Sequence, residues 1–111
     1  QLYIRRNTMK KVFLVLSAVM LLASFSVAFA DGDAANLFKT YCQGCHGADG
    51  GRVPAKGIPP IKGQSAADLL KKLEGYKDGS FGAQRKLVME NVVKQLSGEQ
   101  LKSLADYGST L

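Results

Sequence analysis

Two cysteines and a histidine stand within five consecutive residues of the sequence, Cys42-Gln43-Gly44-Cys45-His46. They are the only cysteines and the only histidine in the chain. Two thiols three residues apart on one helical turn project to the same side, where both can form thioether bonds with the vinyl groups of a haem. His46 follows directly and is carried beneath the iron as an axial ligand. The pattern C-x-x-C-H therefore predicts the covalent attachment of one haem c.

Three other uses of this motif compete with haem attachment. A disulfide between Cys42 and Cys45 suits an oxidising compartment, but it would close a very small loop and constrain the chain little. A thioredoxin-like C-x-x-C requires a surrounding βαβ pattern. A zinc site requires a fourth ligand, for which Asp49 is the nearest candidate. We favour haem because the five-residue pattern is more specific than any of the three.

A second axial ligand follows from elimination. A second histidine ligand is excluded because His46 has no counterpart in the sequence. Of the three methionines, Met9 and Met20 lie in the N-terminal segment, and Met89 alone belongs to the remainder of the chain. The competing interpretation of Met89 is an ordinary core residue on an amphipathic helix. Ligation by His46 and Met89 would leave no open position on the iron, which favours electron transfer over oxygen chemistry.

The first thirty residues differ in character from the rest. Lys10 and Lys11 precede an uncharged run over residues 12–30, which ends in Ala28-Phe29-Ala30. A basic start, an apolar middle and a small-residue site predict a secretory signal peptide over residues 1–30, with Met9 as initiator and cleavage after Ala30. The alternative is a retained membrane anchor, since the run is just long enough to span a bilayer. We expect an exported, periplasmic protein without a membrane span in its mature form.

The mature part, residues 31–111, is small and nearly neutral. Four of the fifteen basic residues lie in the leader, and the remaining eleven exceed the nine acidic residues by two. Basic stripes with interleaved aromatic residues are missing from the sequence, so nucleic-acid binding has no support. A core of this size rarely supplies more than about 3–5 kcal/mol, which favours a fold completed by a cofactor.

The hydrophobic pattern of the mature part predicts an all-α domain. We expect a first helix over residues 33–44. A glycine- and proline-rich segment over residues 47–63 is predicted to be a loop that wraps around another group rather than an element that packs by itself. A capping residue at Ser65 opens a second helix that ends near Gly75, and a third follows over residues 84–96. Ser97 and Gln100 form a capping box that starts the last helix. The predicted apolar lining of the haem site is Leu69, Leu73, Val88, Val92, Val93 and Leu104.

Over residues 31–111 the chain resembles the class I cytochromes c and is most similar to the small bacterial cytochromes c553. Ala34, Phe38 and Cys42 occupy the small-x-x-x-aromatic-x-x-x-Cys positions of the family's first helix. Tyr107 matches the C-terminal aromatic residue that crosses this helix. The resemblance implies a compact class I cytochrome c fold, with about four helices wrapped around one covalently attached haem.

The resemblance also assigns roles in the loop before the second helix. Pro59-Pro60-Ile61-Lys62-Gly63 resembles the family's P-x-L-x-G segment, with Ile61 in place of leucine. By this match, Ile61 contacts the haem and the carbonyl of Pro59 accepts a hydrogen bond from His46 Nδ1, which orients the ring. The chain departs from many relatives after Met89, where Glu90 stands in place of a proline.

The function implied by this resemblance is that of a soluble, monomeric, monohaem electron carrier rather than an enzyme. Its partners would be redox proteins, with a dehydrogenase or hydrogenase as donor and an oxidase or reductase as acceptor. The competing function is a five-coordinate haem enzyme or gas sensor of the cytochrome c′ kind, in which the motif lies near the C-terminus. A rim of basic residues around the haem edge is predicted to steer an acidic partner, formed by Arg52, Lys56, Lys62, Arg85 and Lys86.

Overall fold

The computed structural model describes residues 3, 5–6, 8–11, 31–83 and 86–111. The apolar run over residues 12–30 and the predicted cleavage site lie outside these residues. From residue 31 onward the described chain forms helices, turns and loops without a strand, which confirms the all-α prediction. The helices are α2 (Asp31–Tyr41), α3 (Gln43–His46), α4 (Ala66–Asp78), α5 (Lys86–Lys94) and α6 (Gly98–Gly108). In the described part of the chain, the helices are too short or too polar to cross a bilayer.

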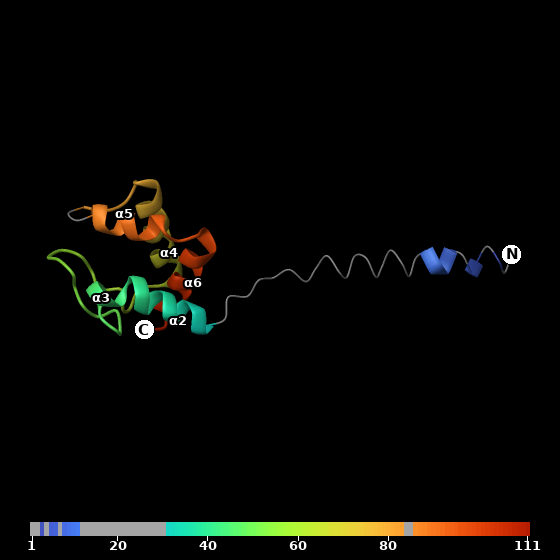
Figure 1. Cartoon of the computed structure of the whole chain (residues 1–111), viewed down its shortest axis with the longest axis horizontal. Coiled ribbons are helices and arrows are strands. Elements are labelled where there is room, and N and C mark those ends of the chain that lie inside the picture. Colours follow the sequence, from blue (N-terminus) through green and yellow to red (C-terminus); the bar gives the residue numbers. More distant parts are fainter. Residues whose placement is uncertain (1–2, 4, 7, 12–30, 84–85) are drawn as a thin grey trace.

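The last helix organises the fold. Helix α6 packs against both α2 and α4, and α4 in turn packs against α5. Helices α2 and α5 therefore lie on opposite sides of the α4–α6 pair, as Figure 1 shows. The irregular segment over residues 47–65 connects α3 to α4 and extends past the end of α2 (Figure 1). This arrangement leaves a space between α3, α5 and the connecting segment.

Side chains cap the two helices that form the central pair. The Ser65 hydroxyl accepts a hydrogen bond from the Asp68 backbone N–H, at 3.1 Å, and starts α4. At the start of α6, Ser97 and Gln100 exchange hydrogen bonds of 2.8 and 3.1 Å between side chain and backbone. This confirms the predicted capping box, which satisfies two of the free N–H groups at the helix start.

The predicted end of α4 at Gly75 is wrong, because the helix continues to Asp78 and ends at Gly79 in the left-handed conformation (φ 81°). Gly75 instead lies buried within the helix, where Phe81 folds back over it. A Cβ atom at this position would stand 2.5 Å from the Phe81 Cβ, so any side chain would force the two segments apart. The glycine therefore serves packing rather than termination.

The first and third helices also differ from their predicted bounds. Helix α2 begins at Asp31 and is interrupted at Cys42, although the His46 N–H still bonds the Cys42 carbonyl at 3.0 Å. Helix α5 ends at Lys94 rather than at Leu96. The N–H groups of Gln95 and Leu96 bond carbonyls three residues back, which tightens the final turn. The predicted start of this helix falls on residues 84–85, outside the described residues.

The core forms where the helices cross. Its buried members are Phe38, Val93, Leu96, Leu101 and Leu104. Phe38 from α2 and Tyr107 from α6 meet at the crossing, with ring centroids 5.4 Å apart and planes inclined by 57°. Such tilted aromatic pairs add about 0.5–1.5 kcal/mol beyond the burial of their surface. The predicted crossing of the first and last helices is confirmed.

Gly108 lets α6 approach its neighbours closely. It is buried, and a Cβ atom there would stand 3.1 Å from Leu69 Cδ1 of α4 and 3.3 Å from Ile61 Cγ2 of the connecting segment. Both distances are shorter than ordinary van der Waals contact, so a side chain at this position would require its neighbours to shift by a few tenths of an ångström. The glycine brings α6 into direct contact with the backs of these two side chains.

Candidate functional site

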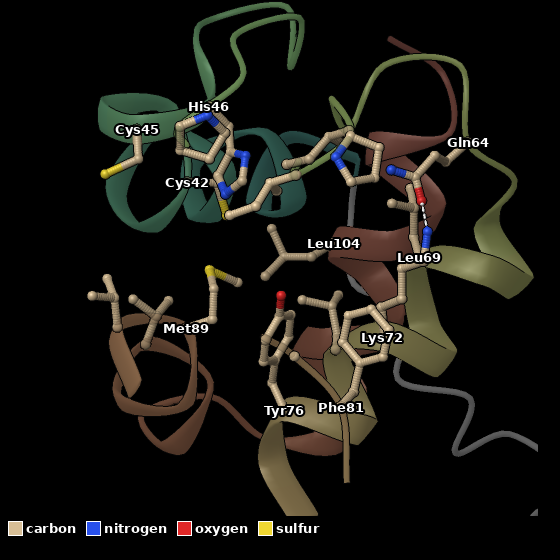
Figure 2. Close-up of a pocket in the computed structure, with 18 of the residues that line it drawn as sticks. Cys42, Cys45, His46, Gln64, Leu69, Lys72, Tyr76, Phe81, Met89 and Leu104 are labelled. Atoms are coloured by element: carbon tan, nitrogen blue, oxygen red, sulfur yellow. Dashed lines mark hydrogen bonds between the residues drawn. The ribbon is translucent and has the colours of Figure 1, made fainter. Parts of the chain in front are cut away.

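A cavity of about 570 Å³ occupies the space between α3, α4, α5 and the connecting segment. Figure 2 shows Cys42, Cys45 and His46 on one side of it and Met89 on the facing side. The structure thus brings together residues that are up to 47 positions apart in the sequence. All the predicted site residues line this one cavity, namely Cys42, Cys45, His46, Pro59, Ile61 and Met89.

The two thiols differ in their surroundings. Cys42 is half-buried and Cys45 is exposed, and both are free. Burial raises the pKa of the Cys42 thiol to about 11, so this group is protonated at neutral pH. The two thiols form no disulfide in this structure. The structure also lacks, within the described residues, any grouping of three or more histidine, cysteine or acidic side chains for a zinc ion and any strand for a thioredoxin-like unit.

His46 is the buried polar residue of the site. Burial lowers the pKa of its imidazole, which favours the neutral form with a lone pair available to a metal. Its Nδ1 atom is buried and finds no hydrogen-bond partner among the described residues. The predicted hydrogen bond to the carbonyl of Pro59 is therefore not formed in this structure. The carbonyl of the next residue, Pro60, accepts instead from the Gln64 side chain at 2.6 Å.

Met89 reaches the cavity from α5. Its side chain is half-buried and packs at the edge of the core cluster. Figure 2 shows its sulfur pointing into the cavity toward the side that carries Cys42 and His46. Tyr76 of α4 stands beside it with its hydroxyl directed into the same space (Figure 2), and burial raises the pKa of this phenol. A thioether and a neutral imidazole thus face the cavity from opposite walls.

The walls between these groups are largely apolar. Five of the six predicted lining residues are found there, namely Leu69, Leu73, Val88, Val92 and Leu104. The sixth prediction, Val93, is wrong, because its side chain is fully buried in the core rather than at the cavity wall. Adjacent positions on α5 point about 100° apart, and the rotation of the helix turns Val92 to the cavity and Val93 into the core.

Two polar residues of the cavity wall were missing from the prediction. Lys72 of α4 and Gln64, just before this helix, both line the cavity, and the Lys72 ammonium donates a hydrogen bond to the Gln64 side-chain oxygen. The signal for Lys72 was present in the sequence. Leu69, Lys72, Leu73 and Tyr76 lie at i, i+3, i+4 and i+7, which places the lysine on the apolar stripe of the helix.

Three residues of the predicted basic rim, Arg52, Lys62 and Lys86, pair with nearby groups of the protein. Arg52 donates to the carbonyl of Gly44 at 3.1 Å, and the Lys62 ammonium lies 3.4 Å from an Asp49 carboxylate oxygen. Arg52 and Lys62 belong to the connecting segment but do not line the cavity. Arg85 lies outside the described residues.

The geometry and chemistry of the cavity fit a haem. The porphyrin is a broad apolar ring, and the cavity offers apolar walls of the size class that encloses such ligands. Two thiols stand at one wall for covalent attachment, and an imidazole and a thioether are available from opposite walls as iron ligands. The residues that would hold the group are therefore Cys42, Cys45, His46 and Met89.

Comparison with known proteins agrees with this geometry. The family model for cytochrome c matches residues 32–111. The chain is 47% identical to a cytochrome c-553 of Nitratidesulfovibrio vulgaris, over 93% of this chain and 100% of that protein. It is 36% identical to a cytochrome c-553 of Desulfomicrobium norvegicum, over 68% of this chain and 92% of that protein. It is 37% identical to a thiosulfate dehydrogenase electron acceptor of Thiomonas intermedia, over 87% of this chain and 43% of that protein.

The family match begins at the first residues of α2 and ends at the last residue of the chain, so it includes every wall of the cavity. The helical fold, the attachment motif and the match all lead to the same assignment. The chain belongs to the cytochrome c family, as a class I c-type cytochrome similar to the cytochromes c-553.

Proposed function

We propose that this chain carries single electrons between redox proteins by means of one covalently bound haem. The observation that supports it most is the cavity that places Cys42, Cys45 and His46 opposite Met89. The sequence contains one C-x-x-C-H motif, which supports a single haem. The bound group supplies the one-electron chemistry at its iron.

The protein's own residues hold that group and shape its surroundings. Cys42 and Cys45 would form the two thioether bonds, and the neutral imidazole of His46 and the thioether of Met89 would be the iron ligands. Imidazole and thioether together raise the reduction potential of the iron. Leu69, Leu104 and the other apolar walls exclude water and lower the local dielectric.

An electron carrier is favoured over an enzyme because ligation by both His46 and Met89 would leave no open position on the iron. Substrate binding or oxygen chemistry requires an open position on the iron, and Met89 points into the space where one would be. The relative from Thiomonas intermedia that is described as an electron acceptor supports the same role. The five-coordinate haem enzyme or gas sensor is the outcome that our test would have to exclude.

The proposal extends to location and partners. Residues 1–30 act as a signal peptide cleaved after Ala30, and the mature monomer works in the periplasm. Its donor is a dehydrogenase or hydrogenase, and its acceptor is an oxidase or reductase. Support for this part comes from the sequence pattern of the leader and from the need of a small carrier to exchange electrons with larger enzymes.

Expression of the full chain in a bacterium that matures c-type cytochromes tests the proposal. The purified protein should have the mass of residues 31–111 plus one haem. Its ferric form should show the far-red band of methionine-ligated iron, and its ferrous form should bind no carbon monoxide. A colourless product with two free thiols, or a wild-type protein that binds carbon monoxide readily, would contradict the proposal.

A matched pair of variants identifies the ligand. Met89→Ala should lose the far-red band and gain a carbon monoxide adduct, because one axial position is opened. Val92→Ala removes a side chain from the same wall of the cavity and should keep the band. Equal behaviour of the two variants would show that Met89 is a packing residue.

A further inference from the structure

The largely apolar wall of the cavity has one position with a permanently charged side chain. Among the described residues that line it, Lys72 is the only lysine or arginine, and aspartate and glutamate are absent. The Lys72 side chain is half-buried on α4 between the cavity-lining residues Leu69 and Tyr76. A lysine usually extends its ammonium group into water from such a position. Here the group turns toward the cavity margin instead, where it meets Gln64.

Gln64 holds this ammonium group in place. Its amide N–H donates to the carbonyl of Pro60 at 2.6 Å, and its side-chain oxygen accepts from Lys72. Gln64 therefore links the connecting segment to α4 and fixes where the positive charge stands. An ammonium group has three donors, and the Gln64 oxygen accepts only one of them. Two donors remain for an anionic ligand or water at the edge of the cavity.

The position of Lys72 relative to the thiols indicates which ligand atoms it would meet. Figure 2 shows Cys42 and Cys45 at one end of the cavity and Lys72 with Gln64 at the other. A haem carries its two vinyl groups on one part of the ring and its two propionates on another. When the vinyl groups are bonded to Cys42 and Cys45, the propionates must point away from these thiols. They are then directed to the end of the cavity that carries the positive charge.

We infer that Lys72, oriented by Gln64, binds a haem propionate in a charge-assisted hydrogen bond. This inference rests on the proposed haem site and assigns a role to a residue pair outside its covalent and iron ligands. A carboxylate that enters an apolar cavity loses its hydration, and an ammonium partner compensates for this loss. Lys72 is thus a positioning residue for the propionate, and Gln64 supports it.

The test compares haem-loaded variants of two neighbouring lysines. Lys72→Gln removes the charge at the cavity, and Lys71→Gln removes an equal charge from an exposed position on the same helix. An opposite charge at close range lowers the pKa of a carboxylate by about 1–3 units. The low-pH break in the curve of midpoint potential against pH should therefore move upward by about one unit or more in Lys72→Gln and stay in place in Lys71→Gln.

A second readout reports on the hydrogen bond itself. The propionate-bending band in the resonance Raman spectrum should shift in Lys72→Gln, return in Lys72→Arg and shift partially in Gln64→Leu. Equal profiles for Lys72→Gln and Lys71→Gln in both measurements would overturn the inference. Mass and absorption spectra of each variant are recorded first. A wild-type chain that acquires no haem overturns the proposed function, whereas a haem-loaded Lys72→Gln with wild-type behaviour overturns this inference alone.

Discussion

The two halves of the molecule are completed in different ways. Where α6 crosses α2 and α4, the chain closes its own core, and Leu101 and Val93 are 1% and 0% exposed. On the other side, between α3, α5 and the connecting segment, apolar side chains surround a cavity of about 570 Å³. The difference teaches that the polypeptide alone buries the apolar side chains of only one half. The other half requires a ligand of porphyrin size.

Helix α5 belongs to both halves. Val93 near its end is fully buried in the core, whereas Val88 and Leu87 near its start are 54% and 67% exposed. Contact between α5 and the rest of the protein is made mainly through α4. We therefore expect α5 to depend on the haem more strongly than α2 or α6 does.

The largest expected effect comes from preventing haem attachment. The double variant Cys42→Ala/Cys45→Ala should be largely unfolded in its haem-free form, because the walls of the cavity would have no partner and the remaining core is too small. Circular dichroism should show most of the helical signal lost relative to the haem-loaded wild type. A haem-free variant with native helix content and a cooperative thermal transition would show that the packed half stabilises the whole fold.

A smaller effect is expected from a change within the packed half. Leu101→Ala in the haem-loaded protein should lower the free energy of unfolding by about 2–5 kcal/mol, since it leaves a hole in a closed core. Leu87→Ala, which truncates an exposed leucine, should change it by less than about 0.5 kcal/mol. Denaturant titrations followed by circular dichroism measure both. Comparable losses in the two variants would contradict the division into a packed and a ligand-dependent half.

Loss of the α6 cap should lower the free energy of unfolding by less than Leu101→Ala does. Ser97→Ala removes the acceptor for the Gln100 N–H and should destabilise the protein by about 1 kcal/mol. Ser97→Asn keeps an acceptor at this position and serves as the control. An unchanged denaturation midpoint in Ser97→Ala would mean that packing of α6 against α2 and α4 holds this end without its cap.

The smallest effect belongs to the connecting segment. The Gly51 N–H, and then Lys62, lower the pKa of the Asp49 carboxyl from its usual 3.8. A group with a lowered pKa stabilises the folded state above its unfolded pKa, and this contribution is lost as the pH falls through its folded pKa. Asp49→Asn should therefore be slightly less stable than wild type at pH 6 and equal to it near pH 2. A stability difference that persists in acid would assign it to packing instead.

Much of the site could be predicted because its signals are local. The C-x-x-C-H motif lies on consecutive residues, Met89 is the single methionine of residues 31–111, and the Ser97 cap needs only Gln100 three positions later. The motif and the cap depend on residue type and short spacing, and the choice of Met89 depends on residue type alone. The structure brings the motif and Met89 to one cavity and forms the cap, so local reasoning was sufficient for them.

The helix end and the wall residue that were predicted wrongly depend on tertiary packing. Glycine often ends a helix, so Gly75 was predicted as the end of α4. Phe81 folds back over it instead, and this contact has no signature in the local sequence. The choice between Val92 and Val93 as a wall residue depends on the rotation of α5, which its packing on α4 sets. The predicted bond between His46 Nδ1 and the Pro59 carbonyl came from a match to a family pattern, and this nitrogen finds no partner among the described residues.

The contact made by Gly108 has a consequence for the width of the ligand chamber. Leu69 and Ile61, whose rear surfaces meet the α6 backbone at this glycine, are also two of the chamber's walls. A methyl group at position 108 would push these walls inward or lift α6 away. The width of the space for the porphyrin thus depends partly on Gly108, a residue without a side chain that does not itself line the cavity.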